Sequence, residues 1–215
     1  MRIGVIGAGS WGTTLANLLA KKGFTTALWV YEEELIPSIA TRKENHLYLP
    51  GIELDGNIVP TGSLQEACHN KDIILNVTPS QIVRQILQQI RDYLSPQAVL
   101  ISASKGIENT TLLTMSEVIR EVLSLHDGSR IAVLSGPSFA LEVSREIPTA
   151  VTIASENQER AQQLQQVFST PYFRVYTNSD VVGVELGGSL KNVIALAAGI
   201  SDGLRFGYNT RAALI

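Results

Sequence analysis

The chain opens with a short apolar run, a glycine-rich turn and then a helical pattern. Residues 2–6 suit a buried strand, and Gly7-Ala8-Gly9-Ser10-Trp11-Gly12 follows them directly. Gly7 permits a tight turn out of the strand, Gly9 lets the backbone approach a pyrophosphate, and Gly12 lets the helix pack closely on a sheet. The helix N-terminus adds free N–H groups and partial positive charge. The pattern predicts a dinucleotide site; the alternative is a glycine-rich turn in another kind of α/β protein.

Strand and helix patterns alternate along most of the chain, which predicts an α/β fold with a Rossmann-like, doubly wound, mostly parallel sheet. The predicted strands are Arg2–Ile6, Thr25–Val30, Asp72–Val77, Ala98–Ser102, Arg130–Leu134, Ala150–Ala154 and Phe173–Tyr176. The predicted helices are Trp11–Lys22, Glu32–Arg42, Pro79–Tyr93, Leu112–Leu125, Glu156–Phe168 and Ser179–Ala198.

The pattern changes near Asn178, where one long helical segment rich in small residues replaces the short alternating elements. We therefore expect a dinucleotide-binding domain over residues 1–177 and the first helical segment of an all-helical second domain over residues 178–215. The last eight residues rise in hydrophobicity without a cap or polar tail. Because termini are usually exposed and polar, we expect the chain to stop inside a helix of something longer.

Composition narrows the class of protein. With 215 residues, 45% of them hydrophobic, the chain can bury a sizeable core. A net charge of −3 gives no strong field for nucleic acid. The single Cys68 excludes an internal disulfide and fits a reducing cytoplasm. No uninterrupted apolar run nears the roughly 18 residues that a membrane helix needs, so we expect no membrane insertion.

An acidic segment follows the second predicted strand. Glu32 lies 20 residues after Gly12, at the spacing where a carboxylate takes the ribose hydroxyls of NAD. No Lys or Arg occurs between Lys22 and Arg42, which favours NAD over NADP. Alternatively, residues 32–34 only place acids at a helix N-terminus. The neighbouring Tyr31 either stacks on an adenine or is an ordinary half-buried aromatic residue.

Three further segments carry candidate chemistry. Lys105 follows a predicted strand among small residues and can point a cation at a phosphate, although a loop lysine is more often solvated. Residues 134–140 form a small-residue turn that offers N–H groups and a hydroxyl to an anion, or simply begin a helix. Lys191 lies in an otherwise apolar helix, where burial lowers the pKa of a lysine and suits it to proton transfer. Its alternative is a stem that reaches the surface.

The histidines His46, His69 and His126 have no spacing typical of a metal site, and no His, Cys and carboxylate cluster stands out. We therefore expect no metal.

Taken together, these segments resemble the NAD(P)-dependent glycerol-3-phosphate dehydrogenases of the bacterial and eukaryotic cytosolic type. The likeness covers the whole chain. It is carried by residues 7–12, 45–50, 104–106, 136–140, 187–192 and 202–209.

The resemblance implies a role for each matching position. Lys191 matches the catalytic proton donor and acceptor, and it also contacts substrate. Lys105, Gly136 and Ser138 match substrate-contacting positions. The positions implied around the dinucleotide are Gly7, Gly9, Ser10, Trp11, Gly12, Tyr31, Glu32, Tyr48, Lys105 and Ala140. Many bacterial members carry Arg or His near positions 31 and 32, so the departure here favours NAD(H) and leaves NADP(H) open.

The resemblance also implies an activity. The reaction is the reversible reduction of dihydroxyacetone phosphate to sn-glycerol 3-phosphate, a cytoplasmic step that supplies glycerophospholipid synthesis, by an enzyme that is a homodimer in its full-length form. Family members complete the substrate site from a helical domain absent here, so the 215 residues alone are expected to turn over little or no substrate. The alternatives are another two-domain dehydrogenase, of the phosphogluconate, hydroxyacid or ketopantoate type, or a non-catalytic NAD(H)-sensing module.

Overall fold

A computed structural model describes residues 1–125 and 128–214. His126, one of the three histidines considered above, lies outside the described residues.

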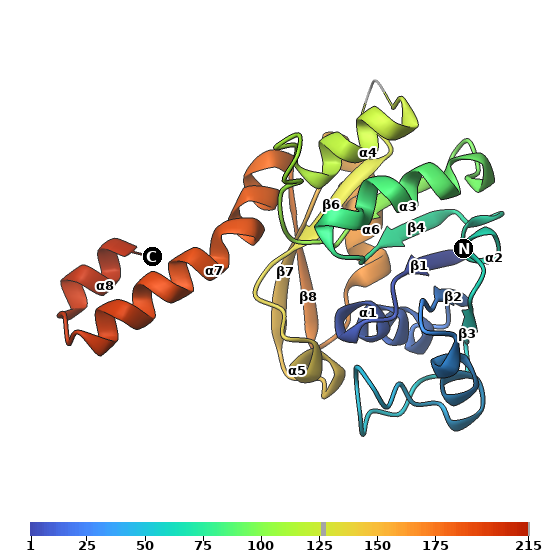
Figure 1. Cartoon of the computed structure of the whole chain (residues 1–215), viewed down its shortest axis with the longest axis horizontal. Coiled ribbons are helices and arrows are strands. Elements are labelled where there is room, and N and C mark those ends of the chain that lie inside the picture. The colour runs from blue at the N-terminus through green and yellow to red at the C-terminus, as the bar shows by residue number, and fades with distance from the viewer. Residues whose placement is uncertain (126–127, 215) are drawn as a thin grey trace.

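Eight strands form one sheet at the centre of the fold (Figure 1). Their order is β3-β2-β1-β4-β5-β6-β7-β8, and every neighbouring pair is parallel except β6 and β7. The strands are β1 (Ile3–Ile6), β2 (Thr26–Trp29), β3 (Ile58–Thr61), β4 (Ile73–Asn76), β5 (Val99–Ser102), β6 (Ile131–Ser135), β7 (Thr149–Ala154) and β8 (Phe173–Asn178). This confirms the predicted Rossmann-like, mostly parallel sheet.

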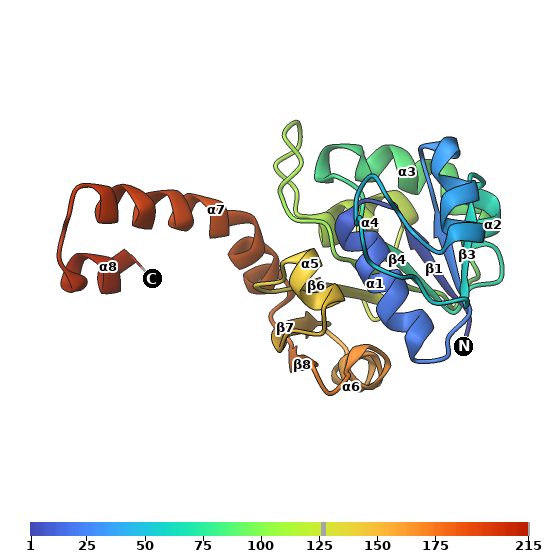
Figure 2. The same cartoon turned by 90° about the horizontal axis from the view of Figure 1, so that it is seen from below.

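Helices cover both faces of the sheet (Figures 1 and 2). The α-helices are α1 (Ser10–Lys21), α2 (Leu64–Cys68), α3 (Val83–Ile90), α4 (Met115–Leu123), α5 (Ala140–Ser144), α6 (Gln158–Phe168), α7 (Val181–Gly203) and α8 (Tyr208–Leu214). Shorter helical turns are η1 (Glu33–Leu35), η2 (Ser38–Arg42), η3 (Ser80–Ile82) and η4 (Arg91–Tyr93).

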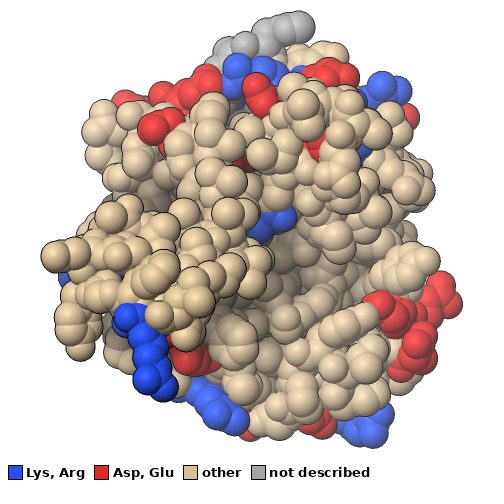
Figure 3. All heavy atoms as spheres, turned by 60° about the vertical axis from the view of Figure 1, so that its left-hand side comes forward, with Lys and Arg blue, Asp and Glu red and all other residues tan. Residues whose placement is uncertain are grey.

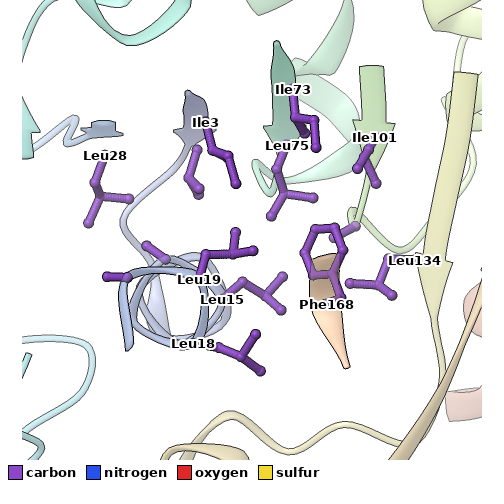
Figure 4. Packing of buried hydrophobic residues seen from close by; sticks show 14 of the residues in the cluster. Ile3, Leu15, Leu18, Leu19, Leu28, Ile73, Leu75, Ile101, Leu134 and Phe168 are labelled. Atoms are coloured by element: carbon purple, nitrogen blue, oxygen red, sulfur yellow. The ribbon is translucent and has the colours of Figure 1, made fainter. Parts of the chain in front are cut away.

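The buried side chains form a layer on each face because successive strand residues point to opposite sides. On one face, Ile3 and Leu75 pack with Leu15 and Leu19 of α1 and with Phe168 of α6 (Figure 4). The opposite face buries a second cluster that joins β1, β4 and β5 to helices α2, α3 and α4. The two layers hold the carboxyl ends of the strands, where ligands bind in this architecture, as one rigid edge.

Strand β7 runs antiparallel to β6. A parallel crossover needs a dozen or more residues and usually a full helix. The connection between these strands contains only α5, which has five residues, and the chain returns in the opposite direction. The next connection contains the 11-residue α6, and β7 and β8 pair in parallel.

One predicted helix is present in an irregular form. Residues 33–42 are helical throughout, but as the 3-10 turn η1, two α-helical residues at 36–37 and the π-helical turn η2 rather than as one regular α-helix. Pro37 stands between them, and a proline lacks the N–H that an α-helix needs at that point.

Two short elements near the sheet edge were not predicted. Strand β3 has a proline in its sequence Ile-Val-Pro-Thr, which weakens the strand signal and is tolerated because β3 is an edge strand. Helix α2 has only five residues, too few to show a helical period.

Helix α7 extends away from the sheet, and α8 folds back beside it (Figures 1 and 2). Many large apolar residues in the second half of α7 are exposed, including Val193, Leu196 and Ile200. Among the described residues, α7 is also the one helix long and apolar enough to span a membrane, with a mean hydropathy of 1.4 over 18 residues. Length and composition alone give that result, and Glu185 and Lys191 interrupt the apolar sequence of the helix.

Candidate active site

The glycine-rich turn lies between β1 and α1, and its three glycines have different surroundings. Gly7 has a φ of +109°, a conformation that favours glycine. A Cβ on Gly12 would lie 1.9 Å from the carbonyl oxygen of Gly7, so the turn and the helix meet without room for a side chain. A Cβ on Gly9 would meet nothing within 4 Å. The protein's own packing therefore requires Gly7 and Gly12, whereas Gly9 borders open space of the kind that a pyrophosphate would fill.

Helix α1 begins beside that space. Gly9 is its N-cap and provides no side-chain acceptor, and the first turn carries no acidic residue. Its first N–H groups are thus available to an anion. Trp11 packs against Phe173 with ring centroids 6.3 Å apart, and its indole Nε1 is buried without a hydrogen-bond partner among the described residues. The turn accordingly fits a phosphate-bearing dinucleotide.

The loop before β3 is tied to the glycine-rich turn by Asn45. The fully buried Asn45 donates from Nδ2 to the carbonyl oxygen of Ala8 at 2.8 Å and to Oγ1 of Thr13 at 2.9 Å. Its Oδ1 accepts from the backbone N–H of Tyr48 at 3.1 Å. These bonds fix Tyr48 relative to the turn.

Tyr48 contacts the predicted ribose-binding carboxylate. Its hydroxyl donates to Oε1 of Glu32 at 2.6 Å, and this bond to a carboxylate raises the pKa of the Tyr48 phenol. Tyr31 is 76% exposed and touches Trp29 edge-on, so the interpretation of Tyr31 as a half-buried aromatic residue is wrong. The structure thus brings Tyr31, Glu32 and Tyr48 to one end of the turn.

Ala140 lies beside helix α1, next to the glycine-rich turn. It begins α5, and its carbonyl oxygen accepts from Oγ1 of Thr14 at 3.3 Å. Oγ1 of Thr14 also lies 2.8 Å from Oγ of Ser144. Helix α5 is therefore docked on the first turns of α1.

Lys105, Gly136 and Ser138 form the second half of the site. The Lys105 ammonium donates to the carbonyl oxygen of Gly136 at 3.2 Å and to Oγ of Ser138 at 3.3 Å. Burial lowers the pKa of Lys105, and the positive charge of Lys191 lowers it further. The first turns of α7, which carry Lys191 further along, lie beside Lys105, because a Cβ on Gly188 would be 3.9 Å from Cγ of Lys105.

The base of α7 packs directly onto these loops. A Cβ on Gly188 would lie 2.3 Å from Oγ of Ser135, so a small residue is needed there. Oγ of Ser189 accepts from the backbone N–H of Gly106 at 3.1 Å. One turn earlier, the buried Glu185 accepts from the backbone N–H of Ser116 at 2.8 Å. Burial raises the pKa of Glu185.

Lys191 is exposed, and the expectation that its helix buries it is wrong. The physical reason is the course of α7, which leaves the sheet after its first turns, so that only 11% of its most apolar stretch is buried even with α8 beside its far end. The face of the molecule on this side is hollowed, with a basic side chain at the bottom of the hollow and acidic side chains toward the periphery (Figure 3).

Sequence reasoning did not select the buried polar residues that support the site. Besides Asn45, these include Asn76, which donates to Oγ of Ser104 at 3.1 Å and accepts from Oγ1 of Thr78 at 3.1 Å. Ser104 stands next to Lys105, so this cluster holds the lysine loop at the end of β4. Polar residues directly after a buried strand are the available signal. No group of three His, Cys, Asp or Glu side chains that could hold a metal occurs among residues 1–125 and 128–214.

The fold and the glycine-rich turn define a Rossmann-like, dinucleotide-binding class of α/β domain. Family models described as the N-terminus and the C-terminus of NAD-dependent glycerol-3-phosphate dehydrogenase match residues 2–161 and 180–215. The chain belongs to this family.

Individual proteins similar to this chain belong to the same family. The chain is 59% identical to the glycerol-3-phosphate dehydrogenase [NAD(P)+] of Geobacter metallireducens, over all of this chain and 64% of that protein. The crystal structure of glycerol-3-phosphate dehydrogenase from Coxiella burnetii matches with a TM-score of 0.87 at 36% identity, over 99% of this chain and 64% of that one. The yeast glycerol-3-phosphate dehydrogenase matches with a TM-score of 0.89 at 33% identity, over 100% and 66%. The chain therefore spans less than two thirds of the length of each of these three relatives.

Proposed function

We propose that this chain carries the dinucleotide site and the catalytic lysine of an NAD(P)-dependent glycerol-3-phosphate dehydrogenase, which interconverts dihydroxyacetone phosphate and sn-glycerol 3-phosphate. One observation carries the proposal: the open space at Gly9 lies at the same sheet edge as the cluster of Lys105, Gly136 and Ser138, on which the base of α7, the helix of Lys191, is packed. A dinucleotide and a small phosphorylated substrate can thus meet at one edge. The names of the relatives, which state NAD(P)+, support this cofactor.

The residues would hold the two ligands as follows. The turn at residues 7–12 binds the pyrophosphate, and Glu32 binds the adenosine ribose, with Trp11, Tyr31, Tyr48 and Ala140 around the dinucleotide. The bound nicotinamide supplies or accepts a hydride. Lys105 and Ser138 orient the substrate, and Lys191 donates a proton to its carbonyl oxygen or removes the proton from its hydroxyl. General acid help of this kind contributes about 10²- to 10⁴-fold to a rate.

We propose that residues 1–177 form the dinucleotide-binding domain and that residues 178–215, which include Lys191, form the first helical segment of a second domain. Lys191 is exposed in the 215-residue chain. Because an exposed lysine keeps water beside its ammonium, we propose that these residues alone have little or no turnover. Glu32, together with the lack of Lys or Arg between Lys22 and Arg42, supports NAD(H) as the preferred nucleotide.

We propose a cytoplasmic protein that forms a homodimer at full length and neither binds nucleic acid nor inserts into a membrane. The net charge of −3 supports the lack of nucleic-acid binding. Glu185 and Lys191 within α7 argue against insertion, because charged residues are costly in a bilayer.

A titration and one substitution test the proposal. NADH is added to the chain, and energy transfer from Trp11 and Trp29 to the reduced nicotinamide reports binding. In a version that spans the full length of the relatives, Lys191→Ala is expected to abolish turnover of dihydroxyacetone phosphate while NADH binding remains. A full-length protein that binds NADH but has no turnover even with Lys191 intact would instead be a sensor of NAD(H).

A further inference from the structure

The side chains of Glu32 and Tyr48 come from separate segments and meet at the dinucleotide end of the site. Glu32 follows β2, whereas Tyr48 lies in the loop before β3. Their 2.6 Å bond uses Oε1 of the carboxylate, and Oε2 has no hydrogen bond among the described residues. One oxygen is thus held while the other stays available to a ligand.

The position of Tyr48 is itself fixed from inside the protein. Asn45 is fully buried, holds the backbone N–H of Tyr48 and donates to the glycine-rich turn at Ala8 and to α1 at Thr13. A continuous set of hydrogen bonds therefore runs from the turn through Asn45 and Tyr48 to the Glu32 carboxylate. The carboxylate is oriented relative to the turn before any ligand arrives.

We propose that Tyr48 is a specificity-determining positioning residue, which orients the Glu32 carboxylate toward the ribose hydroxyls and thereby sets the preference for NAD(H) over NADP(H). The inference rests on the proposed function, because it concerns the same dinucleotide site.

The physical basis is the geometry and charge of one carboxylate. A carboxylate can accept bonds from the two hydroxyls of a ribose but repels the dianionic 2′-phosphate of NADPH. An exposed glutamate samples several rotamers, which weakens both effects. A short bond to a phenol removes that freedom without neutralising the charge. The exposed Glu33 and Glu34 add negative charge nearby but lack such an anchor within the described residues.

The experiment measures the dissociation constants of NADH and NADPH for the parent chain, Tyr48→Phe, Glu32→Gln and the double variant. Tyr48→Phe keeps the ring and removes only the hydroxyl of a residue that is 37% exposed, so folding is preserved. Tyr176→Phe is the matched control, because Tyr176 is 49% exposed on the distant strand β8 and undergoes the same chemical change.

Tyr48→Phe is expected to lower the ratio of the NADPH to the NADH dissociation constant by about three- to tenfold. Glu32→Gln lowers that ratio by about tenfold or more, and adding Tyr48→Phe to Glu32→Gln changes it by less than about twofold. Tyr176→Phe leaves it unchanged.

Two other outcomes overturn the inference in distinguishable ways. If Tyr48→Phe weakens both nucleotides equally, or acts fully in the Glu32→Gln background, Tyr48 does not work through Glu32, and the proposed function stands. If the folded parent chain binds neither nucleotide, the proposed dinucleotide site fails and the inference fails with it.

Discussion

Alanine substitutions at Gly9 and Gly12 test two different roles of the glycine-rich turn. We expect Gly12→Ala to destabilise the fold and Gly9→Ala to weaken dinucleotide binding. A Cβ on Gly12 would lie 1.9 Å from the Gly7 carbonyl oxygen, whereas real Cβ contacts essentially never fall below 3.0 Å. The turn or the helix must then move by about 1 Å within a close-packed region. Overpacking of this kind costs about 3 kcal/mol of unfolding free energy.

Gly9→Ala should behave differently. Its backbone, with φ at −63° and ψ at 178°, suits alanine, and its Cβ meets no protein atom within 4 Å. Alanine is a poorer N-cap than glycine by about 0.5–1 kcal/mol, and lower unfolded-state entropy offsets this by about 0.4–1 kcal/mol. We expect the unfolding free energy to stay within about 1 kcal/mol of the parent. NADH affinity should fall by about tenfold or more, because the new methyl group occupies the approach to the pyrophosphate.

Urea unfolding followed by circular dichroism gives the stabilities, and tryptophan-to-NADH energy transfer gives the affinities. Gly23→Ala is not a suitable control, because Gly23 has a φ of +89°. Gly56→Ala is suitable, since its Cβ also meets nothing within 4 Å and it lies outside the site. Two results would refute the reasoning: parental NADH binding by Gly9→Ala, or a loss of stability in Gly9→Ala as large as in Gly12→Ala.

Three further substitutions test the electrostatics of the site. The raised pKa of the Tyr48 phenol should return toward its ordinary value in Glu32→Gln, because the bond to a carboxylate is lost. Ultraviolet titration measures this pKa, with Tyr48→Phe identifying the Tyr48 signal. An unchanged titration in Glu32→Gln would contradict the bond. Burial raises the pKa of Glu185, so the folded state binds its proton more tightly than the unfolded state. The parent should therefore gain stability relative to Glu185→Gln as the pH falls toward the unfolded pKa of a glutamate, and lose this stability as the pH rises through the raised folded pKa. Urea unfolding of both proteins across this pH range measures the difference. A difference that does not depend on pH would contradict the prediction. Lys191→Met should raise the pKa of Lys105 by removing a nearby positive charge, as followed by carbon-13 NMR of the Lys105 Cε, and a fall would be inconsistent with the proximity of the two lysines.

Local patterns in the sequence were sufficient to predict most of the sheet. Each of the seven predicted strands is present, with ends that differ by at most two residues, because buried parallel strands are short apolar runs bounded by turns. The helix expected at 32–42 is present but changes from 3-10 to π geometry around Pro37, a residue whose effect on a helix was visible in the sequence.

The sequence predicted the backbone features of the site better than its side-chain contacts. The glycine spacing identified the turn because Gly7 and Gly12 answer steric requirements of the fold, whereas Gly9 leaves open space for a ligand. The anchoring by Asn45 joins residues up to 37 positions apart, and no sequence period indicates which loop asparagine is buried. The exposure of Lys191 depends on what covers α7, which the apolar pattern of the helix alone does not reveal.

The attachment of α7 to the sheet gives the helix the mechanics of a lever. Its fulcrum is at Gly188 and Ser189, which are seated on Ser135 and Gly106, and its long arm projects beyond them (Figure 2). Lys191 lies about 4.5 Å along the axis from Gly188, whereas Gly203 lies about 22 Å from it, at 1.5 Å per residue. A swing of the far end is therefore reduced about fivefold at the lysine. A displacement of several ångströms at the far end would therefore move the backbone of Lys191 by only about an ångström.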